Sequence, residues 1–395
     1  MNIATPITTG YAVDTSRGEI RTDLQKQWMA RPADQRFTSL SALEAAVKAR
    51  AEASRENRID TRKVEIIAPE ARSKADIHHL SVGLPGGIEV APTHWSFGQL
   101  ANLAKAPAGY LRTIPSQISA DALTYGLRYC RGDVERIKTY HSGDELLAAT
   151  GPDYGRIFDH EVVAAVRNVA GDGTGDTRWK VPGEFDWRTR RYDPDRPITI
   201  DSTTLYASDR DVFIFLVDDK NPIEVGKLAN GEPDRIFRGF YVTNSEVGSG
   251  SLRIASFFLR GACMNRLMIG VEDFEEIRMV HSKMAPSRFI EQAAPALASY
   301  ADGSVAKISA GVQRAKDAKV ADDDDEMLEF LNARAGSRAR ARAMLELHEH
   351  EEGFPARSAW DAGQAMTAYA RRSIYQDERV ALEREAGKVL TKAAA

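Results

Sequence analysis

Basic side chains alternate with aromatic ones in two stretches of the chain, residues 178–196 and residues 235–260. Arginine and lysine neutralise phosphates, and exposed aromatic rings stack on bases of any sequence. Each stacked base contributes roughly 1–3 kcal/mol, so a few rings beside a row of cations are enough to hold a single strand. The pattern therefore predicts a groove for single-stranded DNA, formed by Arg178, Trp179, Lys180, Trp187, Arg188, Arg190, Arg191, Arg235, Arg238, Tyr241, Arg253 and Arg260.

Two features of the sequence favour a more ordinary interpretation of these residues. The first stretch also contains Glu184, Asp186, Asp193 and Asp195, which cancel much of its positive charge, and the formal net charge of the chain is −4. This charge argues against a protein that coats nucleic acid through bulk electrostatics, but it is compatible with a local basic groove. The alternative is that Trp179 and Trp187 pack a hairpin onto the body of the protein.

Glycines follow an Asn-Ser pair in the segment NSEVGSG, residues 244–250. A glycine-rich turn exposes backbone N–H groups that can bind phosphate. However, no Lys-Ser/Thr pair follows, and the spacing fits neither the P-loop nor the dinucleotide fingerprint. We therefore interpret Gly248 and Gly250 as turn residues, and Asn244 and Asn265 as residues that cap local backbone rather than bind a ligand.

Histidines and carboxylates occur without the spacing of a catalytic or metal site. His348 and His350 are two positions apart, which places them on different sides of a helix, so we expect them at a solvated helix end. His281 follows a predicted strand, and no Ser or Cys pairs with it in a known nucleophile motif. The arginines of residues 334–342 spread around a predicted helix and are expected to be solvated. The sequence thus predicts no catalytic residues, no metal and no cofactor.

The hydrophobic patterns predict an α+β fold with a largely antiparallel central sheet, N-terminal helices and a helical C-terminal region. Residues 236–243 and 252–259 are rich in β-branched and aromatic residues on both faces, so we expect a hairpin in the middle of the sheet. Residues 197–201 and 211–217 precede it as further predicted strands, and successive strands favour antiparallel pairing. Helical spacing recurs in six segments after residue 288, and the acidic run 322–325 is expected to cap one of them.

Composition is ordinary for a globular protein of 395 residues, with 43% hydrophobic and 28% charged residues. We expect a polar N-terminal arm (1–37), an α+β core domain (38–285) with the central hairpin at 235–260, and a helical C-terminal region (286–395). Cys130 and Cys263 lie far apart in the sequence, so we expect both to be reduced thiols in the core. Reduced thiols indicate a cytoplasmic protein. We expect no signal peptide and no membrane span. The sequence is compatible with an oligomer.

The turn NSEVGSG, followed by FFLRGACMNRL, resembles the phage/plasmid-like protein family catalogued as domain of unknown function 932. Asn244, Ser245, Gly248, Gly250, Cys263 and Asn265 match its N-S-x-x-G-x-G turn and downstream C-x-N. Residues 97–115 resemble its opening segment, and residues 151–160 loosely resemble a second block. Residues 358–371 resemble its closing helix, with Gln364 in the position of an Asn. The resemblance implies a phage- or plasmid-encoded protein of a bacterial host.

Two function classes follow from these observations. The first is a nonenzymatic protein that binds or anneals single-stranded DNA during replication or recombination, because the strand–strand–strand–helix order is similar in outline to the core of single-strand annealing proteins. The alternative is an accessory protein that binds and modulates a host protein, of an anti-defence or anti-restriction type. The two classes differ in whether the basic and aromatic side chains share one exposed surface.

Overall fold

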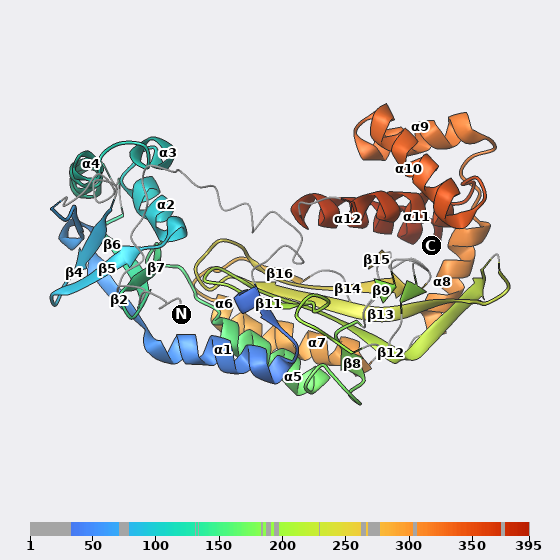
Figure 1. Ribbon diagram of the computed structural model, residues 1–395, viewed down its shortest axis with the longest axis horizontal. Coiled ribbons are helices and arrows are strands. Elements are labelled where there is room, and N and C mark those ends of the chain that lie inside the picture. Colours follow the sequence, from blue (N-terminus) through green and yellow to red (C-terminus); the bar gives the residue numbers. More distant parts are fainter. Residues whose placement is uncertain are drawn as a thin grey trace, which may run out of the picture.

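The computed structural model describes residues 33–70, 79–130, 132, 134–182, 185–186, 191–192, 197–228, 230–261, 266–267, 277–302, 306–372 and 376–394. The fold is α+β, as the sequence predicts. Figure 1 shows a long central sheet with a lobe at each end, both lobes rising from the same side. We name these the N-terminal lobe (residues 54–150) and the C-terminal lobe (residues 306–394). None of the described helices is both long and apolar enough to cross a membrane.

The central sheet is antiparallel, in the strand order β1-β11-β12-β13-β14-β15, with β8 paired to β12 and β16 paired to β14. Its strands are β1 (Arg36–Phe37), β8 (Trp179–Lys180), β11 (Leu205–Ala207), β12 (Val212–Lys227), β13 (Pro233–Asn244), β14 (Leu252–Arg260), β15 (Arg266–Leu267) and β16 (Ile277–Met279). The predicted hairpin is β13–β14, and β13 lies between β12 and β14. Its predicted central position is therefore confirmed. A separate two-stranded pair joins β9 (Phe185–Asp186) to β10 (Arg191–Tyr192).

Helices cover one face of the central sheet. These are α1 (Leu40–Ala53), α5 (Asp159–Ala170), α6 (Ala285–Arg288) and α7 (Ala294–Asp302), which lie beneath the strands in Figure 1. Leu216, Phe240 and Ile254, one from each long strand, face these helices in a continuous core. This alternation of inward side chains along each strand follows from the two-residue period of β structure.

The opposite face of the same strands is aromatic and is also buried. Phe213 stacks on Tyr241 with ring centroids 6.0 Å apart, and Phe215 stacks on Phe257 at 4.2 Å. Phe237 and Leu259 complete this buried layer. Strands β12, β13 and β14 are therefore buried on both faces over most of their length. Any polar side chain on them must find a partner inside the protein.

The N-terminal lobe contains a second sheet, of which the sequence suggests only two short strands, at residues 63–69 and 77–83. Its order is β2-β6-β7-β5-β4-β3, antiparallel except for the parallel pair of β5 and β7. The strands are β2 (Ser54–Asp60), β3 (Glu65–Ile67), β4 (Ser81–Leu84), β5 (Ile88–Pro92), β6 (Arg136–Ser142) and β7 (Glu145–Thr150). Helices α2 (His94–Leu103), α3 (Ala108–Leu111) and α4 (Ser116–Tyr129) pack with this sheet around a core of their own.

The C-terminal lobe confirms the predicted helices. It contains α8 (Ala306–Asp317), α9 (Asp324–Ala335), α10 (Arg338–Glu352), α11 (Ala359–Ala370) and α12 (Gln376–Ala394). Asp323 caps α9 by accepting a hydrogen bond from Glu326 N at 2.9 Å, as predicted for the acidic run. Helix α11 is buried on nearly every side, and a Cβ at Gly363 would lie only 3.0 Å from Leu390 Cδ2 of α12. Small residues along α11 thus allow this close packing.

Three expectations of local structure were wrong. Residues 197–201 form no strand, because hydrogen bonds between Thr199 and Ser202 close a turn there. Cys130 is exposed at the C-terminus of α4 and is not a core thiol. Arg36 and Phe37 belong to the sheet edge, not to an arm. Residues 1–32 and Cys263 lie outside the described residues.

Replacing Gly239 on β13 should test how tightly the sheet is filled. A Cβ at this position would lie 2.1 Å from Phe257 Cζ and 2.9 Å from Leu216 O. We expect Gly239→Ala to lower the free energy of unfolding by about 1–3 kcal/mol through overpacking. Gly250→Ala is the matched control, because a Cβ there meets nothing within 4 Å, and its effect should stay within about 0.5 kcal/mol. Equal denaturation midpoints for the two variants would contradict this packing.

Candidate functional site

The residues predicted to bind DNA include four that are buried. Trp179, Arg238, Tyr241 and Arg260 are each at most 3% exposed. The Arg238 guanidinium donates to the Tyr300 carbonyl and lies between two rings, 5.6 Å from the Trp179 centroid and 4.7 Å from that of Tyr300. These side chains are part of the core. The prediction that they form an exposed surface for a strand is corrected, because the fold buries all four side chains.

The remaining described members are engaged by neighbouring groups. Arg178 pairs with Asp218 at 2.6 Å, Lys180 with Asp219 at 3.0 Å, and Arg235 with Glu224 at 3.6 Å. Arg253 is half-buried, and its Nε donates to Ser251 Oγ at 3.5 Å. Arg191 lies in β10, but its side chain is outside the described residues, as are Trp187, Arg188 and Arg190. The described members are therefore paired with neighbouring groups, and the side chains of Arg178 and Arg235 stay 40% and 49% exposed.

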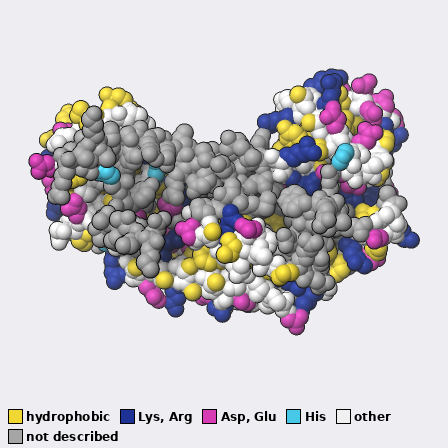
Figure 2. All heavy atoms as spheres, in the orientation of Figure 1, with side chains coloured by type: hydrophobic (Ala, Val, Ile, Leu, Met, Phe, Trp, Pro, Cys, Tyr) yellow, Lys and Arg dark blue, Asp and Glu magenta, His cyan; other side chains and the backbone are white. Residues whose placement is uncertain are grey.

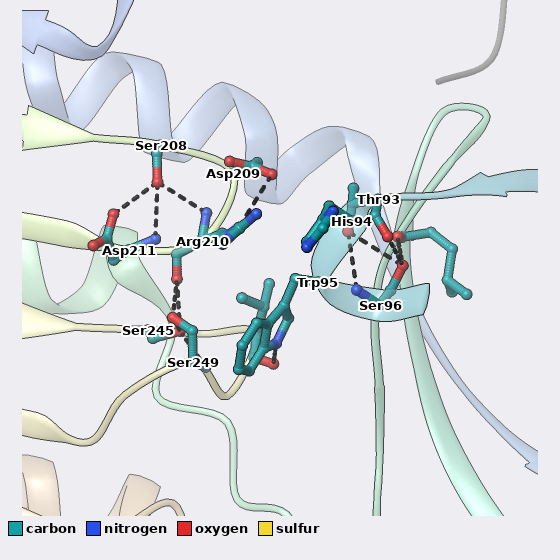
Figure 3. Close-up of polar contacts among 12 residues, drawn as sticks. Thr93, His94, Trp95, Ser96, Ser208, Asp209, Arg210, Asp211, Ser245 and Ser249 are labelled. Carbon is teal, nitrogen blue, oxygen red and sulfur yellow. Dashed lines mark hydrogen bonds and ion pairs between the residues drawn. The ribbon is translucent and has the colours of Figure 1, made fainter. Parts of the chain in front are cut away.

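The predicted turn residues lie at a junction between the central sheet and the N-terminal lobe. Asn244 Nδ2 donates to Ile157 O and to Asp159 Oδ1, both at 2.8 Å. Ser245 Oγ donates to Arg210 O at 2.6 Å and accepts from Ser249 N at 2.9 Å (Figure 3). These bonds fix the path of the turn. Gly248 has φ of 87° and its N–H donates to Ser245 O, which agrees with its interpretation as a turn residue.

Helix α2 holds the other side of this turn. Trp95 Nε1 and Gln99 Nε2 both donate to the Val247 carbonyl, at 3.1 and 2.9 Å, and Gln99 Oε1 accepts from Ala149 N. Figure 3 shows the Trp95 indole between the α2 backbone and the turn. Arg210 lies 5.9 Å from the Trp95 ring centroid. We call this set of contacts around residues 244–249 the turn junction. The groups named above are bonded within the protein, whereas the buried Asn244 Oδ1 has no described partner.

Two carboxyl groups are buried side by side in the turn junction. Glu246 Oε2 accepts from the Asp159 backbone N–H at 3.1 Å, and Glu246 Oε1 accepts from the Tyr140 hydroxyl at 3.3 Å. Burial and the neighbouring Glu246 charge raise the pKa of Asp159 well above its usual range. Arg156 lies within the same cluster and donates to the Glu246 carbonyl. Asp159 is thus held toward its protonated form.

His281 packs into the turn junction from the segment after β16. Its Nδ1 lies 3.1 Å from Gly155 O, and its ring stacks on Tyr154 with centroids 5.1 Å apart. Burial lowers the pKa of His281 to about 4, so the ring is neutral near pH 7. This neutral ring joins residues 154–157 to the sheet. Among the described residues, no three His, Cys, Asp or Glu side chains are grouped to hold a metal ion.

Comparison with known families agrees with the resemblance of the segments at 244–267 and 358–371, whereas residues 97–115 and 151–160 lie outside the matched range. Residues 195–387 match the family model described as Domain of unknown function (DUF932). The chain carries a DUF932 domain. Neither the curated proteins nor the solved structures contain a match. The DUF932 domain therefore includes the long strands, the turn, helices α8 to α11 and most of α12. Gln99 and Asp159 contact the turn from outside the matched range.

A surface that sequence reasoning missed lies outside the DUF932 domain, on α4. Ile118, Tyr125 and Tyr129 are 56%, 62% and 72% exposed. Their spacing of seven and four residues places them on one side of the helix, opposite the buried Leu123 and Leu127. The Tyr125 and Tyr129 ring centroids are 5.0 Å apart. We call this the α4 stripe. The spacing is visible in the sequence, but only the fold shows that no other described element covers it.

Substituting Asp159 should change how the stability of the junction depends on pH. The native state retains the Asp159 proton above the pH at which an unfolded aspartate, with its ordinary pKa near 3.8, releases it. The free energy of unfolding therefore falls as pH rises through the interval between these two pKa values. Asp159→Asn stays neutral and keeps an oxygen acceptor for Asn244, so we expect a smaller fall between pH 4 and pH 8.

The measurement is urea denaturation of the variant and the parent at several pH values. His281 contributes in the opposite sense, because its depressed pKa lowers the free energy of unfolding as pH falls below about 6.5. Both proteins contain His281, so its contribution cancels in the difference between their unfolding free energies. Asp153→Asn, at an exposed position, is the control and should follow the parent. Parallel curves for Asp159→Asn and the parent would show that Asp159 is ionised in the fold.

Proposed function

We propose that this protein is a nonenzymatic accessory protein of a phage, plasmid or integrated element, and that it acts in the bacterial cytoplasm by binding another protein. The partner is of host or phage origin. The observation that carries this proposal is the α4 stripe, three large side chains that the fold leaves exposed on one helix side. The mobile-element origin rests on the resemblance of the DUF932 motif segments.

The chemistry of the α4 stripe suits a protein partner. Tyrosine is enriched at energetically important positions of protein interfaces, because it offers apolar area with little conformational entropy and a hydroxyl for hydrogen bonding. Residues at i, i+7 and i+11 are the anchors with which a helix enters an apolar groove. Tyr110 on the adjoining α3 is also 61% exposed. Figure 2 shows hydrophobic side chains gathered at the top of the lobe that holds α3 and α4.

The placement of the predicted DNA-binding residues also favours a protein partner over single-stranded DNA. Four of them are inside the core, and three others already pair with Asp218, Asp219 and Glu224. A phosphate would compete with the buried carboxylates of Asp218 and Asp219 for Arg178 and Lys180, whereas the Arg235–Glu224 pair lies at the surface. An accessory protein that recognises another protein has no need of an exposed basic groove.

The test is recovery of a partner by the tagged protein and by Tyr125→Ser/Tyr129→Ser, followed by titration of the purified partner. Removal of two interface tyrosines should weaken binding roughly 30-fold or more, which corresponds to about 2 kcal/mol at a hot spot. Gln117→Ser is the matched control, because Gln117 is exposed on another side of α4. If the double serine variant binds the partner as tightly as the parent, the α4 stripe is not the interface.

Binding of single-stranded DNA is a second candidate, and exposed arginines on α10 favour it. Arg338, Arg340 and Arg342 lie in the first turns of this helix, and all three are exposed. Cations near a helix N-terminus interact unfavourably with the helix dipole, by about 0.3–1 kcal/mol each. Arg338 also pairs with Glu329 of α9 at 3.3 Å, an exposed contact of the kind that salt screens. Figure 2 shows basic side chains near the top of the lobe that holds α9 and α10.

Titration of a fluorescent single-stranded oligonucleotide at two salt concentrations tests this candidate. We expect affinity to fall with salt. The triple change Arg338→Gln/Arg340→Gln/Arg342→Gln should reduce the salt dependence by about one unit of slope for each phosphate that is no longer neutralised. The tyrosine variant of α4 should behave as the parent in this assay. Absence of salt-sensitive binding to any oligonucleotide removes the candidate and leaves the protein-binding proposal intact.

A further inference from the structure

A cavity of about 370 Å³ lies between the far end of the central sheet and helices α8, α10 and α11. It is at the opposite end of the molecule from the α4 stripe (Figure 1). Arg260 from β14 and Trp360 and Gln364 from α11 line it, so two segments that resemble family motifs meet here. The volume is in the range of sites for small organic molecules.

The floor of this cavity is charge-balanced and fixed. Arg260 donates to both oxygens of Asp234, at 2.9 and 3.1 Å, and to both oxygens of Glu352, at 2.5 and 3.1 Å. Lys316 lies 3.4 Å from Asp234 and 5.2 Å from the Trp360 ring centroid. Two cations thus oppose two carboxylates. The floor has no excess charge for an anion, but its geometry is rigid.

His348 provides hydrogen-bonding capacity that the protein leaves unused. Its side chain lines the cavity and the residue is 1% exposed, yet neither ring nitrogen has a hydrogen-bond partner among the described residues. The expectation of a solvated helix end was therefore wrong for His348, because α10 turns this side toward α11. A neutral imidazole offers one donor and one acceptor. The two nitrogens point in different directions and are covered by neighbouring atoms, so a molecule that displaces this cover can hydrogen-bond to one of them.

The mouth of the cavity offers an aromatic ring and a cation. Phe354 is 47% exposed and meets the His348 ring edge to face, with centroids 5.4 Å apart. Lys227 is exposed at the mouth and has no ion-pair partner among the described residues. A planar ring can therefore lie against Phe354 while a negative group extends to Lys227.

We propose that this cavity binds a mononucleotide, with the base directed to His348 and Phe354 and the phosphate to Lys227. A nucleobase combines a planar ring with hydrogen-bond donors and acceptors on its edge. It can therefore supply the hydrogen-bond partner that His348 lacks. Its phosphate supplies the negative charge that the mouth accommodates. This site goes beyond the proposed protein-binding function and does not depend on it.

Isothermal titration with AMP, GMP, CMP and dTMP tests the site, and adenosine and inorganic phosphate report on the two halves of the ligand. At least one nucleotide should bind more tightly than either half. His348→Phe should weaken nucleotide binding roughly tenfold, through loss of hydrogen bonding to the base. His348→Gln retains a donor and an acceptor and should bind the nucleotide better than His348→Phe. Lys227→Ala should weaken binding and its salt dependence, whereas the exposed Lys283→Ala should not.

Several outcomes overturn the proposal. These are no binding of any nucleotide, phosphate alone binding as tightly as the nucleotide, or nucleotide affinity unchanged in both His348→Phe and Lys227→Ala. Thermal unfolding of each variant establishes that it is folded before titration. A 5′-phosphorylated oligonucleotide that binds where the free nucleotides fail would also overturn it, and would assign the cavity to the end of a strand.

Discussion

Burial of the β12–β13–β14 strands on both faces is the constraint on which the rest of the structure depends. A cation inside such a sheet is tolerated only when carboxylates, carbonyls or rings surround it. Arg238 meets this condition between Trp179 and Tyr300, and Arg260 meets it between Asp234 and Glu352. These two arginines of the hairpin are therefore structural elements that tie the sheet to the segments around it.

The two ends of this sheet serve different purposes. At one end the turn of residues 244–250 is held by Asn244, Ser245 and Gln99, although Asn244 Oδ1 and His281 Nε2 are buried there without a described partner. At the other end Arg260 anchors a cavity in which His348 keeps both ring nitrogens without a described partner. Buried polar atoms without a described partner therefore occur at both ends of the sheet, and His348 is distinguished by its place beside a cavity of about 370 Å³.

The separation of these features explains how one chain can present distinct surfaces. The α4 stripe lies on the N-terminal lobe, outside the DUF932 domain, and the cavity lies within that domain. The rigid sheet between them keeps the two lobes apart (Figure 1). A protein partner on α4 and a small molecule near α11 would therefore not compete for the same groups. Each proposal can fail without affecting the other.

Local sequence determined much of this protein. The hairpin, its Asn-Ser turn, the capping acid of α9 and the helices of the C-terminal third follow from patterns within about twenty residues, because backbone hydrogen bonding and side-chain period are local properties. Most of the second sheet was missed, since β6 contains Arg136, Lys138 and His141 and lacks the apolar run of a buried strand. The turn of Thr199 and Ser202 was mistaken for a strand because the β-branched residues Ile198, Thr199 and Ile200 have the composition of one.

Only the tertiary structure decided which side chains face solvent. An arginine beside an aromatic residue has the same local pattern whether it contacts DNA or lies in a core, and the difference depends on Asp234, Tyr300 and Glu352, which are distant in sequence from most of their partners. The same holds for His348, buried by α11, and for Tyr125 and Tyr129, which no described element covers. Burial is a property of the assembled chain, because it depends on segments that meet only after folding.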